Sequence, residues 1–466
     1  MLWFGRLFAV PGITLLVVFV LARPQEFIPL LARLPFLHLF TLLAVLGYIL
    51  DIRLRRLQPI AANTLPWVVA FFVWAILATA VAAPATLVSL LLFLIILFAL
   101  YGTVAHGIQR FRTFQIVALV LCLTSTFIAG VCLHQGVAPM QCIAGIESEA
   151  GVDGEPDGRS CSTSEECRGP DADPGAEYRC EHVGLFGTYS VDERVRYRGE
   201  LNDPNEVAMV ICAGGMAVLL GFMLRKRGSP VLQTLCFLGI VVCVVAVWMT
   251  QSRGGLIVML LVPGVYAVRR WGWAVVIPAA VIALPILMLG GRSGENADVS
   301  TEMRYEAWGV GLDMWHHNPI FGVGARQFAA HHYLTAHNSF VLMLAELGIV
   351  GLFLFAAIVY LCIKTLILGL RELRTTPGTR AAQIWGMALL AAMTGILFQI
   401  NTLSFAYHMA LWLFFGLCGA WYSAIRHHKP DFEVKLHFVD VLIIATSCLA
   451  YATIILPLFL RAKGEL

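Results

Sequence analysis

Polar side chains that could do chemistry gather in residues 292–351, within an otherwise apolar chain. His337 marks the change from this polar segment to a hydrophobic span, Asn338 follows it directly, and Glu346 lies further along the same span. Placing ionisable groups at or inside a lipid boundary costs free energy, so such residues are candidates for function. A neutral imidazole can accept a proton from a hydroxyl group, and we therefore expect His337 to act as a general base.

Arginines mark three polar stretches of the chain. Arg194, Arg196 and Arg198 alternate along one segment, Arg253 stands in a glycine-containing turn between two apolar spans, and Arg304 lies in the long polar segment. Alternate residues of an extended chain point to one side, so the first three are expected to form a cationic strip. Guanidinium groups pair with two phosphate oxygens at once and stay charged, which favours a phosphate-bearing ligand. The alternative for Arg253 is a simple contact with lipid phosphate.

Helical signals surround these arginines. Residues 202–205 are typical of a turn followed by a helix start, because Asn and Asp side chains bond nearby backbone amides. Arg304, Trp308, Gly311 and Trp315 recur at helical spacing and predict one face of a helix along the membrane interface. Tryptophans at that depth ordinarily anchor a helix, an alternative that explains the tryptophans well and Arg304 poorly.

Metal-ligand residues are present but poorly spaced for a metal ion. Four histidines fall in the polar segment: His316, His317, His331 and His332. Adjacent histidines on a helix point about 100° apart, and no carboxylate is suitably spaced beside them. Asp171 and Asp173 match the D-x-D pattern of metal-dependent glycosyltransferases, but they lie in the loosest part of an outer loop. We therefore expect no metal ion at the site.

The composition assigns the chain to the membrane. Hydrophobic residues make up 59% of the 466 positions, charged residues 13%, and the mean hydropathy is +0.80. Soluble domains carry roughly a quarter charged residues, so we predict an all-α, polytopic integral membrane protein. Apolar runs of about 17 to 25 residues predict roughly thirteen spans, the first of them retained rather than cleaved. The spans lie near residues 7–22, 35–50, 64–83, 85–103, 114–133, 206–224, 231–249, 255–268, 273–290, 338–362, 383–402, 407–425 and 439–460.

Basic residues in the short loops predict the orientation. They cluster in alternate loops, near residues 53–56, 110–112, 225–227, 269–270, 364–380 and 426–435. A cytoplasmic N-terminus puts all these clusters on the inner side. The chain then divides into membrane segments 1–133, 206–291 and 338–466, separated by two long outer loops, residues 134–205 and 292–337. The net charge of +3 follows from this topology and does not suggest nucleic acid.

Cysteines divide between the first outer loop and the spans. Cys142, Cys161, Cys167 and Cys180 lie in the loop, and the rest lie in or beside apolar runs. Four cysteines facing an oxidising compartment suggest two disulfides, with three possible connectivities. A zinc site is the alternative, although the spacing fits no zinc-ribbon pattern. The composition of residues 151–174 predicts an irregular loop held mainly by those bridges.

Several arginines and one histidine at an outer membrane face suit a diphosphate leaving group attached to a lipid. Nucleotide sugars and ATP are not available outside the cell, so an activated sugar has to arrive on a lipid carrier. His337 would then accept the proton of an acceptor hydroxyl, and the arginines would stabilise charge on the departing diphosphate.

Three motifs resemble the O-antigen ligase/polymerase superfamily. They are Arg196-x-x-Gly199 with Asp203-Pro204-Asn205, the turn Ser252-Arg253-Gly254-Gly255, and a block from Arg304 through Asn318-Pro319 and Ala336-His337-Asn338 to Glu346-x-Gly348-x-x-Gly351. The resemblance covers about residues 185–425. It implies a GT-C-like, multi-helix glycosyltransferase that uses undecaprenyl-diphosphate-linked glycans. The cysteine-bearing insertion, residues 142–180, departs from usual members.

The resemblance also implies roles for single residues. His337 matches the histidine proposed to activate the acceptor. The arginines that match those thought to hold the donor diphosphate are Arg196 or Arg198, Arg253 and Arg304. The residues expected to support the site are Asn205, Asn338 and Glu346.

We therefore expect a metal-independent glycosyltransferase without a cofactor, in the bacterial inner membrane, with its active site facing the periplasm. Its expected partners are a lipid-linked glycan donor, an acceptor and membrane lipids, with a flippase and a chain-length regulator as candidates. A repeat-unit acceptor would make it a polymerase, which we favour because the outer insertion is unlike a typical ligase. A lipid A–core acceptor would make it a ligase. A transporter or flippase is the third alternative, but its charged residues would line a pathway within the membrane.

Overall fold

The computed structural model describes residues 7–28, 30–31, 34–148, 151–169, 172, 175–224, 229–290 and 295–465. Asp171, Asp173 and the basic residues 225–227 lie outside these ranges, so what was predicted for them stays a prediction. Within the described part of the chain, eleven helices are long and apolar enough to cross a membrane. This confirms the prediction of an all-α, polytopic membrane protein.

The helices coincide with the predicted spans. Those long enough to cross are α2 (Phe36–Arg53), α3 (Leu65–Ala82), α4 (Leu87–Gly107), α5 (Phe111–Val137), α6 joined to α7 (Pro204–Val210 and Ala217–Met223), α8 (Pro230–Met249), α9 (Arg253–Trp271), α12 (Ser339–Thr375), α13 (Arg380–Gln399), α14 (Met409–His428), and α15 joined to α16 (Phe438–Ala450 and Leu456–Lys463). Two shorter apolar helices, α1 (Ala9–Leu21) and α10 (Val276–Gly290), occupy the remaining predicted spans. The predicted helix of the polar segment is α11 (Glu295–His317).

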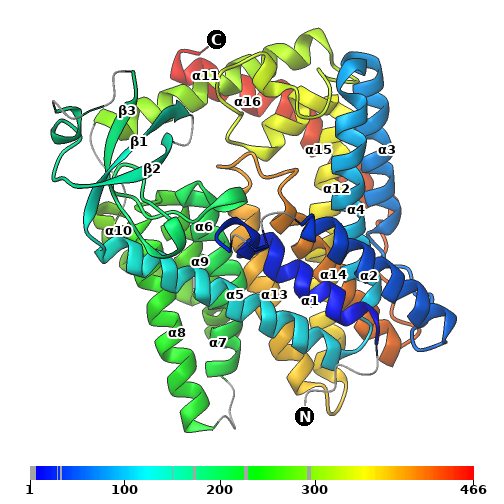
Figure 1. Cartoon of the computed structure of the whole chain (residues 1–466). Coiled ribbons are helices and arrows are strands. Elements are labelled where there is room, and N and C mark those ends of the chain that lie inside the picture. Colours follow the sequence, from blue (N-terminus) through cyan, green and yellow to red (C-terminus); the bar gives the residue numbers. More distant parts are fainter. Residues whose placement is uncertain are drawn as a thin grey trace. The chain divides into compact units, whose positions relative to one another are not determined.

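The chain folds into two compact units, whose elements are labelled in Figure 1. The first unit consists of Met1–Val20, Pro35–Leu119 and Ser293–Leu466. The second consists of Leu21–Leu34 and Val120–Arg292. The first unit therefore contains α11 and α12, and the second contains the cysteine-bearing loop and α9.

In the first unit, α14 is the innermost helix, since every residue from Met409 to Ile425 is buried. Small residues let α4 approach it closely: a Cβ added at Gly416 would lie 2.9 Å from Val104 Cβ, and one at Gly419 would lie 2.7 Å from Ala105 Cβ. Close backbone approach at glycines is a common basis of helix packing in membranes. By contrast, α2 exposes large apolar side chains along its length, as a lipid-facing helix does.

The second unit carries a small antiparallel sheet of three strands (Figure 1). The strands are β1 (Met140–Ser148), β2 (Gly151–Ser160) and β3 (Glu177–His182), in the order β2-β1-β3. The prediction of an irregular loop over residues 151–174 is therefore wrong for its first ten residues. The composition suggested irregular structure, but β2 pairs with β1 through main-chain groups, which place few demands on side-chain type.

The four loop cysteines pack together, Cys142 on β1, Cys180 on β3, and Cys161 and Cys167 in the connection between β2 and β3. The structure joins Cys142 to Cys167 and Cys161 to Cys180, and the register of β1 against β3 sets Cys142 opposite Cys180. Tyr178 packs with them in a small core. The two bridges thus fasten both the strands and the connection between β2 and β3.

Candidate functional site

A break divides α12 near its N-terminal end. A continuous helix of 37 residues would be about 55 Å long, well beyond the roughly 30 Å of a hydrocarbon core. At Gly348 the backbone leaves the helical conformation, with φ +67°. A Cβ at this position would lie 2.1 Å from the carbonyl oxygen of Ile320. Both the conformation and the lack of space require glycine, and residues 339–347 form a separate N-terminal piece.

The loop of residues 318–328 closes this break through its main chain. Three backbone hydrogen bonds join the two segments: Val323 N–H to Ala345 O (3.0 Å), Gly324 N–H to Glu346 O (2.9 Å) and Ile349 N–H to Pro319 O (3.0 Å). The indole N–H of Trp74, on α3, donates to Leu347 O (2.9 Å). Backbone groups freed by a helix break need partners within a membrane protein, and this loop supplies them. The loop and the N-terminal piece of α12 therefore form one structure.

Glu346 uses a buried carboxylate to hold the same loop. Its Oε2 accepts the N–H of Arg326 (2.7 Å), its Oε1 accepts the N–H of Phe328 (2.9 Å), and the residue is 1% exposed. A buried carboxylate is tolerated when hydrogen-bond donors meet it in this way. The guanidinium of Arg326 lies over the ring of Phe93 on α4, 4.3 Å from its centroid. Glu346 thus fixes the loop and does not face an open path.

His337 occupies a strained turn directly before α12. Its φ of +45° falls in the left-handed region, which residues other than glycine seldom enter. Asn338 caps the helix, since its Oδ1 accepts the N–H groups of Phe340 (2.9 Å) and Val341 (3.2 Å). The His337 side chain is partly exposed. Backbone strain of this kind persists only where the surroundings hold it, and it gathers at functional sites.

Ser339 ties this turn to the connection between α13 and α14. Its N–H donates to Ile400 O (2.7 Å) and its hydroxyl donates to Leu403 O (2.7 Å). The same hydroxyl oxygen accepts the N–H of Phe405 (2.8 Å). These three bonds hold the start of α12, directly after the His337 turn, against residues 400–405.

Trp308 connects α11 to the other side of the turn. Its indole N–H donates to Ala336 O (2.7 Å), the carbonyl directly before His337. Arg304 lies four residues earlier, on the same face of α11. The helix predicted from the Arg304 and Trp308 spacing is confirmed. The face that carries Arg304 is also the face that contacts the His337 turn.

The chain leading to His337 also packs on α11. The Tyr333 hydroxyl donates to Glu306 Oε2 (3.3 Å), and Nε2 of the buried His332 lies 3.7 Å from Glu306 Oε1. Partial loss of hydration on α11, and then the adjacent Glu306 carboxylate, raise the pKa of Tyr333. Residues 332–333 are thereby held before the strained turn begins.

In the second unit, Arg253 is the exposed first residue of α9. Ser252 caps this helix by accepting the Gly255 N–H (2.8 Å), and its hydroxyl donates to Asn205 Oδ1 (2.5 Å). Asn205 in turn donates to Asp203, the cap of α6, so it links two helix starts. Among the described residues, the Arg253 side chain has no hydrogen-bond or ion-pair partner. A free guanidinium at a helix N-terminus is well placed to bind an anion.

The arginines at 194, 196 and 198 bond to main-chain carbonyls of different segments. Arg194 donates to Thr250 O (3.0 Å), Arg196 to Tyr189 O (3.2 Å), and Arg198 to the carbonyls of Glu26 (2.8 Å) and Phe186. The predicted one-sided cationic strip is not seen as one exposed surface, because Arg196 is buried whereas Arg194 and Arg198 are partly exposed, and the three side chains bond to different segments. Arg196 is only 4% exposed, which favours a structural role.

Sequence patterns do not identify every residue that builds the site. Thr79 on α3 accepts the Ala325 N–H (2.9 Å), and Trp74 bonds the helix break, yet both stand in an apolar span that gives no hint of a partner. Arg326 is likewise one basic residue among many. Its left-handed backbone, with φ +59°, is visible only in the structure.

This fold defines a multi-pass membrane protein. Residues 206–356 match the family model for O-antigen ligase, which confirms the resemblance to the O-antigen ligase/polymerase superfamily. The matched segment contains these predicted site residues: Arg253, Arg304, His337, Asn338 and Glu346. Among curated proteins, none matches the chain. The family match supports a ligase- or polymerase-type function in membrane glycan assembly.

Proposed function

We propose that this protein polymerises undecaprenyl-diphosphate-linked glycan repeat units at the periplasmic face of the bacterial inner membrane. The observation that carries the proposal is the His337 turn. It presents a partly exposed imidazole on a strained backbone, held from both sides by Asn338 and Trp308. Catalytic groups need this kind of fixed geometry. The turn also lies inside the segment that matches the family.

In the proposed reaction, the acceptor hydroxyl oxygen attacks the anomeric carbon while the bond from that carbon to the diphosphate oxygen breaks. His337 takes the hydroxyl proton, and the diphosphate leaves with the bonding electrons. Attack opposite the leaving group inverts the anomeric centre. Arg304 and Arg253 are proposed to stabilise negative charge on the leaving diphosphate, without a metal ion or cofactor.

The acceptor separates the polymerase from the alternative, a ligase that transfers the glycan to lipid A–core. The cysteine-bearing sheet supports the polymerase, because typical ligases lack such an insertion. A transporter has less support. Glu346, an acid within an apolar helix, has both oxygens bonded by loop N–H groups and is not available to line a pathway.

His337→Asn tests the proposal most sharply, because Asn tolerates the left-handed backbone at this position but cannot accept the proton. Transfer should fall by at least about a hundredfold, and His337→Ala should behave alike. Binding of the lipid-linked donor should be largely kept. The matched control is His316→Ala, on the exposed surface of α11, which should retain activity.

The assay is glycan transfer in liposomes, with a lipid-linked repeat unit or lipid A–core as the acceptor. Transfer only to lipid A–core would make the protein a ligase. Near-normal transfer by His337→Asn would remove His337 from the chemistry. Flipping of the donor without any transfer by the wild type would overturn the enzyme proposal.

A further inference from the structure

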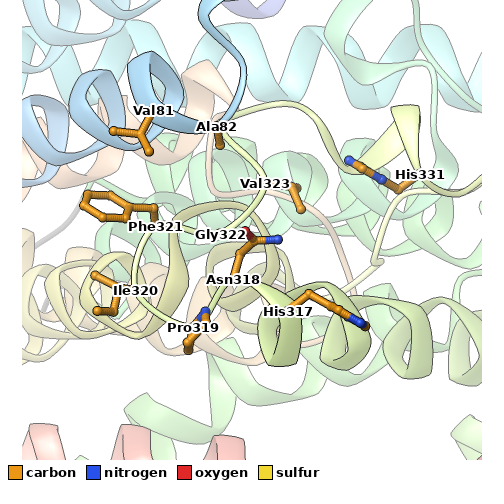
Figure 2. Close-up of a pocket in the computed structure, with 10 residues that line it drawn as sticks. All are labelled: Val81, Ala82, His317, Asn318, Pro319, Ile320, Phe321, Gly322, Val323 and His331. Carbon is orange, nitrogen blue, oxygen red and sulfur yellow. The ribbon is translucent and has the colours of Figure 1, made fainter.

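A cavity of about 540 Å³ lies beside the loop that closes the α12 break. Figure 2 shows Val81 and Ala82, at the end of α3, on one side of this loop and His317 of α11 on the other. Asn318 and His331 complete its polar wall. All of these residues belong to the first unit. The volume falls within the roughly 300–1,000 Å³ of small-molecule sites.

The lining combines polar and apolar groups and carries no fixed charge. Its side chains are two imidazoles, one carboxamide, the phenyl ring of Phe321 and several aliphatic groups, with the peptide groups of residues 318–323 between them. A diphosphate would require cationic partners, which this lining lacks. A sugar ring, by contrast, offers hydroxyls to imidazole and amide groups and C–H faces to aliphatic side chains. The chemistry of the cavity therefore fits a neutral sugar.

His317 is oriented for such a contact. Its Nδ1 lies 3.0 Å from the carbonyl oxygen of Asp313, one turn earlier on α11. The Asp313 carboxylate also lies 3.5 Å from Nδ1, so Asp313 engages this nitrogen and leaves Nε2 to bond a hydroxyl group. The His317 side chain is 73% exposed, so Nε2 is accessible to a hydroxyl group.

The loop that lines the cavity is hydrogen-bonded to the helix segment that follows His337. Val323 lines the cavity and donates its N–H to Ala345, on the N-terminal piece of α12 that begins two residues after His337. His331 precedes His337 by six residues, along a segment held on α11 by Tyr333. A sugar bound in the cavity would be positioned by the same hydrogen-bonded structure that positions the imidazole.

We propose that this cavity binds a neutral sugar residue of the glycan near the reacting hydroxyl. The inference rests on the proposed function, and the sugar could belong to the acceptor or to the donor. His317 Nε2, His331 and Asn318 bond its hydroxyls. The aliphatic side chains of Ala82 and Val323 contact its C–H face.

The test uses full-length protein with His317→Ala, His331→Ala and the double variant. Each lost hydrogen bond should raise the KM of one substrate about five- to tenfold, with kcat little changed. A rise for the acceptor assigns the sugar to the acceptor, and a rise for the donor assigns it to the donor. His316→Ala is the matched control, because His316 neighbours His317 but does not line the cavity.

Ala82→Trp supplies an independent variant, since Ala82 is exposed and a large ring there would fill the cavity without removing a polar group. It should raise the same KM as the histidine variants. Unchanged KM values in Ala82→Trp and in the double variant would overturn the proposal. So would an equal effect of His316→Ala.

Direct binding separates this inference from the proposed function. The probe is the free oligosaccharide released from the lipid carrier by mild acid, and the readout is saturation-transfer NMR with the protein in detergent. Binding that the double variant and Ala82→Trp both lose would support the cavity even if the wild type transferred no glycan. Binding that both variants retain would exclude the cavity even if transfer were confirmed.

Discussion

Replacing Glu346 with glutamine tests how far this one carboxylate holds the loop beside the α12 break. The amide keeps one oxygen, but its NH2 group cannot accept the second backbone N–H. One of the two bonds, at 2.7 Å to Arg326 or 2.9 Å to Phe328, is therefore lost. A hydrogen bond to a charged group contributes about 1.5–3 kcal/mol. Since about 1.4 kcal/mol corresponds to a factor of ten, local opening of the loop should become roughly 10- to 100-fold more frequent.

Hydrogen exchange measured by mass spectrometry on protein in detergent reads this opening directly. Peptides that contain residues 326–328 should exchange roughly 10- to 100-fold faster in Glu346→Gln than in the wild type, while peptides of α14 should not change. Glu302→Gln, an exposed substitution on α11, is the matched control and should leave the loop unchanged. Transfer should also fall, because the loop and the piece of α12 beside His337 share their hydrogen bonds.

Two results would refute this reasoning. Unchanged exchange at residues 326–328 would show that the carboxylate does not hold the loop. Faster exchange spread equally over α14 and the loop would show that Glu346 stabilises the whole unit and not this segment in particular.

Other parts of the site lead to further expectations. Arg253→Lys and Arg304→Lys should each lower transfer about 10- to 100-fold, because lysine keeps the charge but loses the two-pronged fork; near-normal rates in both would reduce these residues to lipid anchors. Purified protein should transfer glycan equally well in EDTA, and a loss that magnesium or manganese restores would contradict the arginine clamp. Phe459 of α16 packs on Trp308, with ring centroids 5.6 Å apart, so Phe459→Ala should lower kcat and leave KM unchanged, whereas Phe459→Leu should recover most of the rate. The neighbouring exposed residue serves as the control, and an equal loss in Leu458→Ala would contradict a positioning role for Phe459.

The helices were predictable because apolar runs of sufficient length have few alternatives in a membrane protein. The helical spacing of Arg304 and Trp308 likewise predicted α11. The break in α12 was not predictable, although Gly348 stood out in the sequence. A glycine in the sequence indicates a close approach or an unusual backbone conformation. The segment that approaches it, here residues 319–320 beside Gly348, is known only from the structure.

For the candidate site, residue types indicated chemistry better than they indicated contacts. Trp308 matched a membrane anchor, yet its indole N–H bonds the carbonyl before His337. The alternation of basic residues suggested a cationic strip. Val195 and Tyr197 are buried, and so is Arg196 between them, so alternation does not separate an exposed face from a buried face in this segment. Periodicity predicts a face only where the chain has one side in solvent.

The joint between the loop of residues 318–328 and α12 also limits how such proteins can recombine. The hydrogen bonds of this joint run between main-chain groups, so many side chains can be substituted without breaking them. A single inserted residue, however, would move the backbone N–H groups out of line with the carbonyls that accept them. A Cβ at Gly322 would lie 2.3 Å from the Glu346 backbone, so neither the loop nor α12 can change its length or backbone path independently of the other. A chimera should therefore inherit residues 295–375 from one parent, with its crossover in the connection after Thr375.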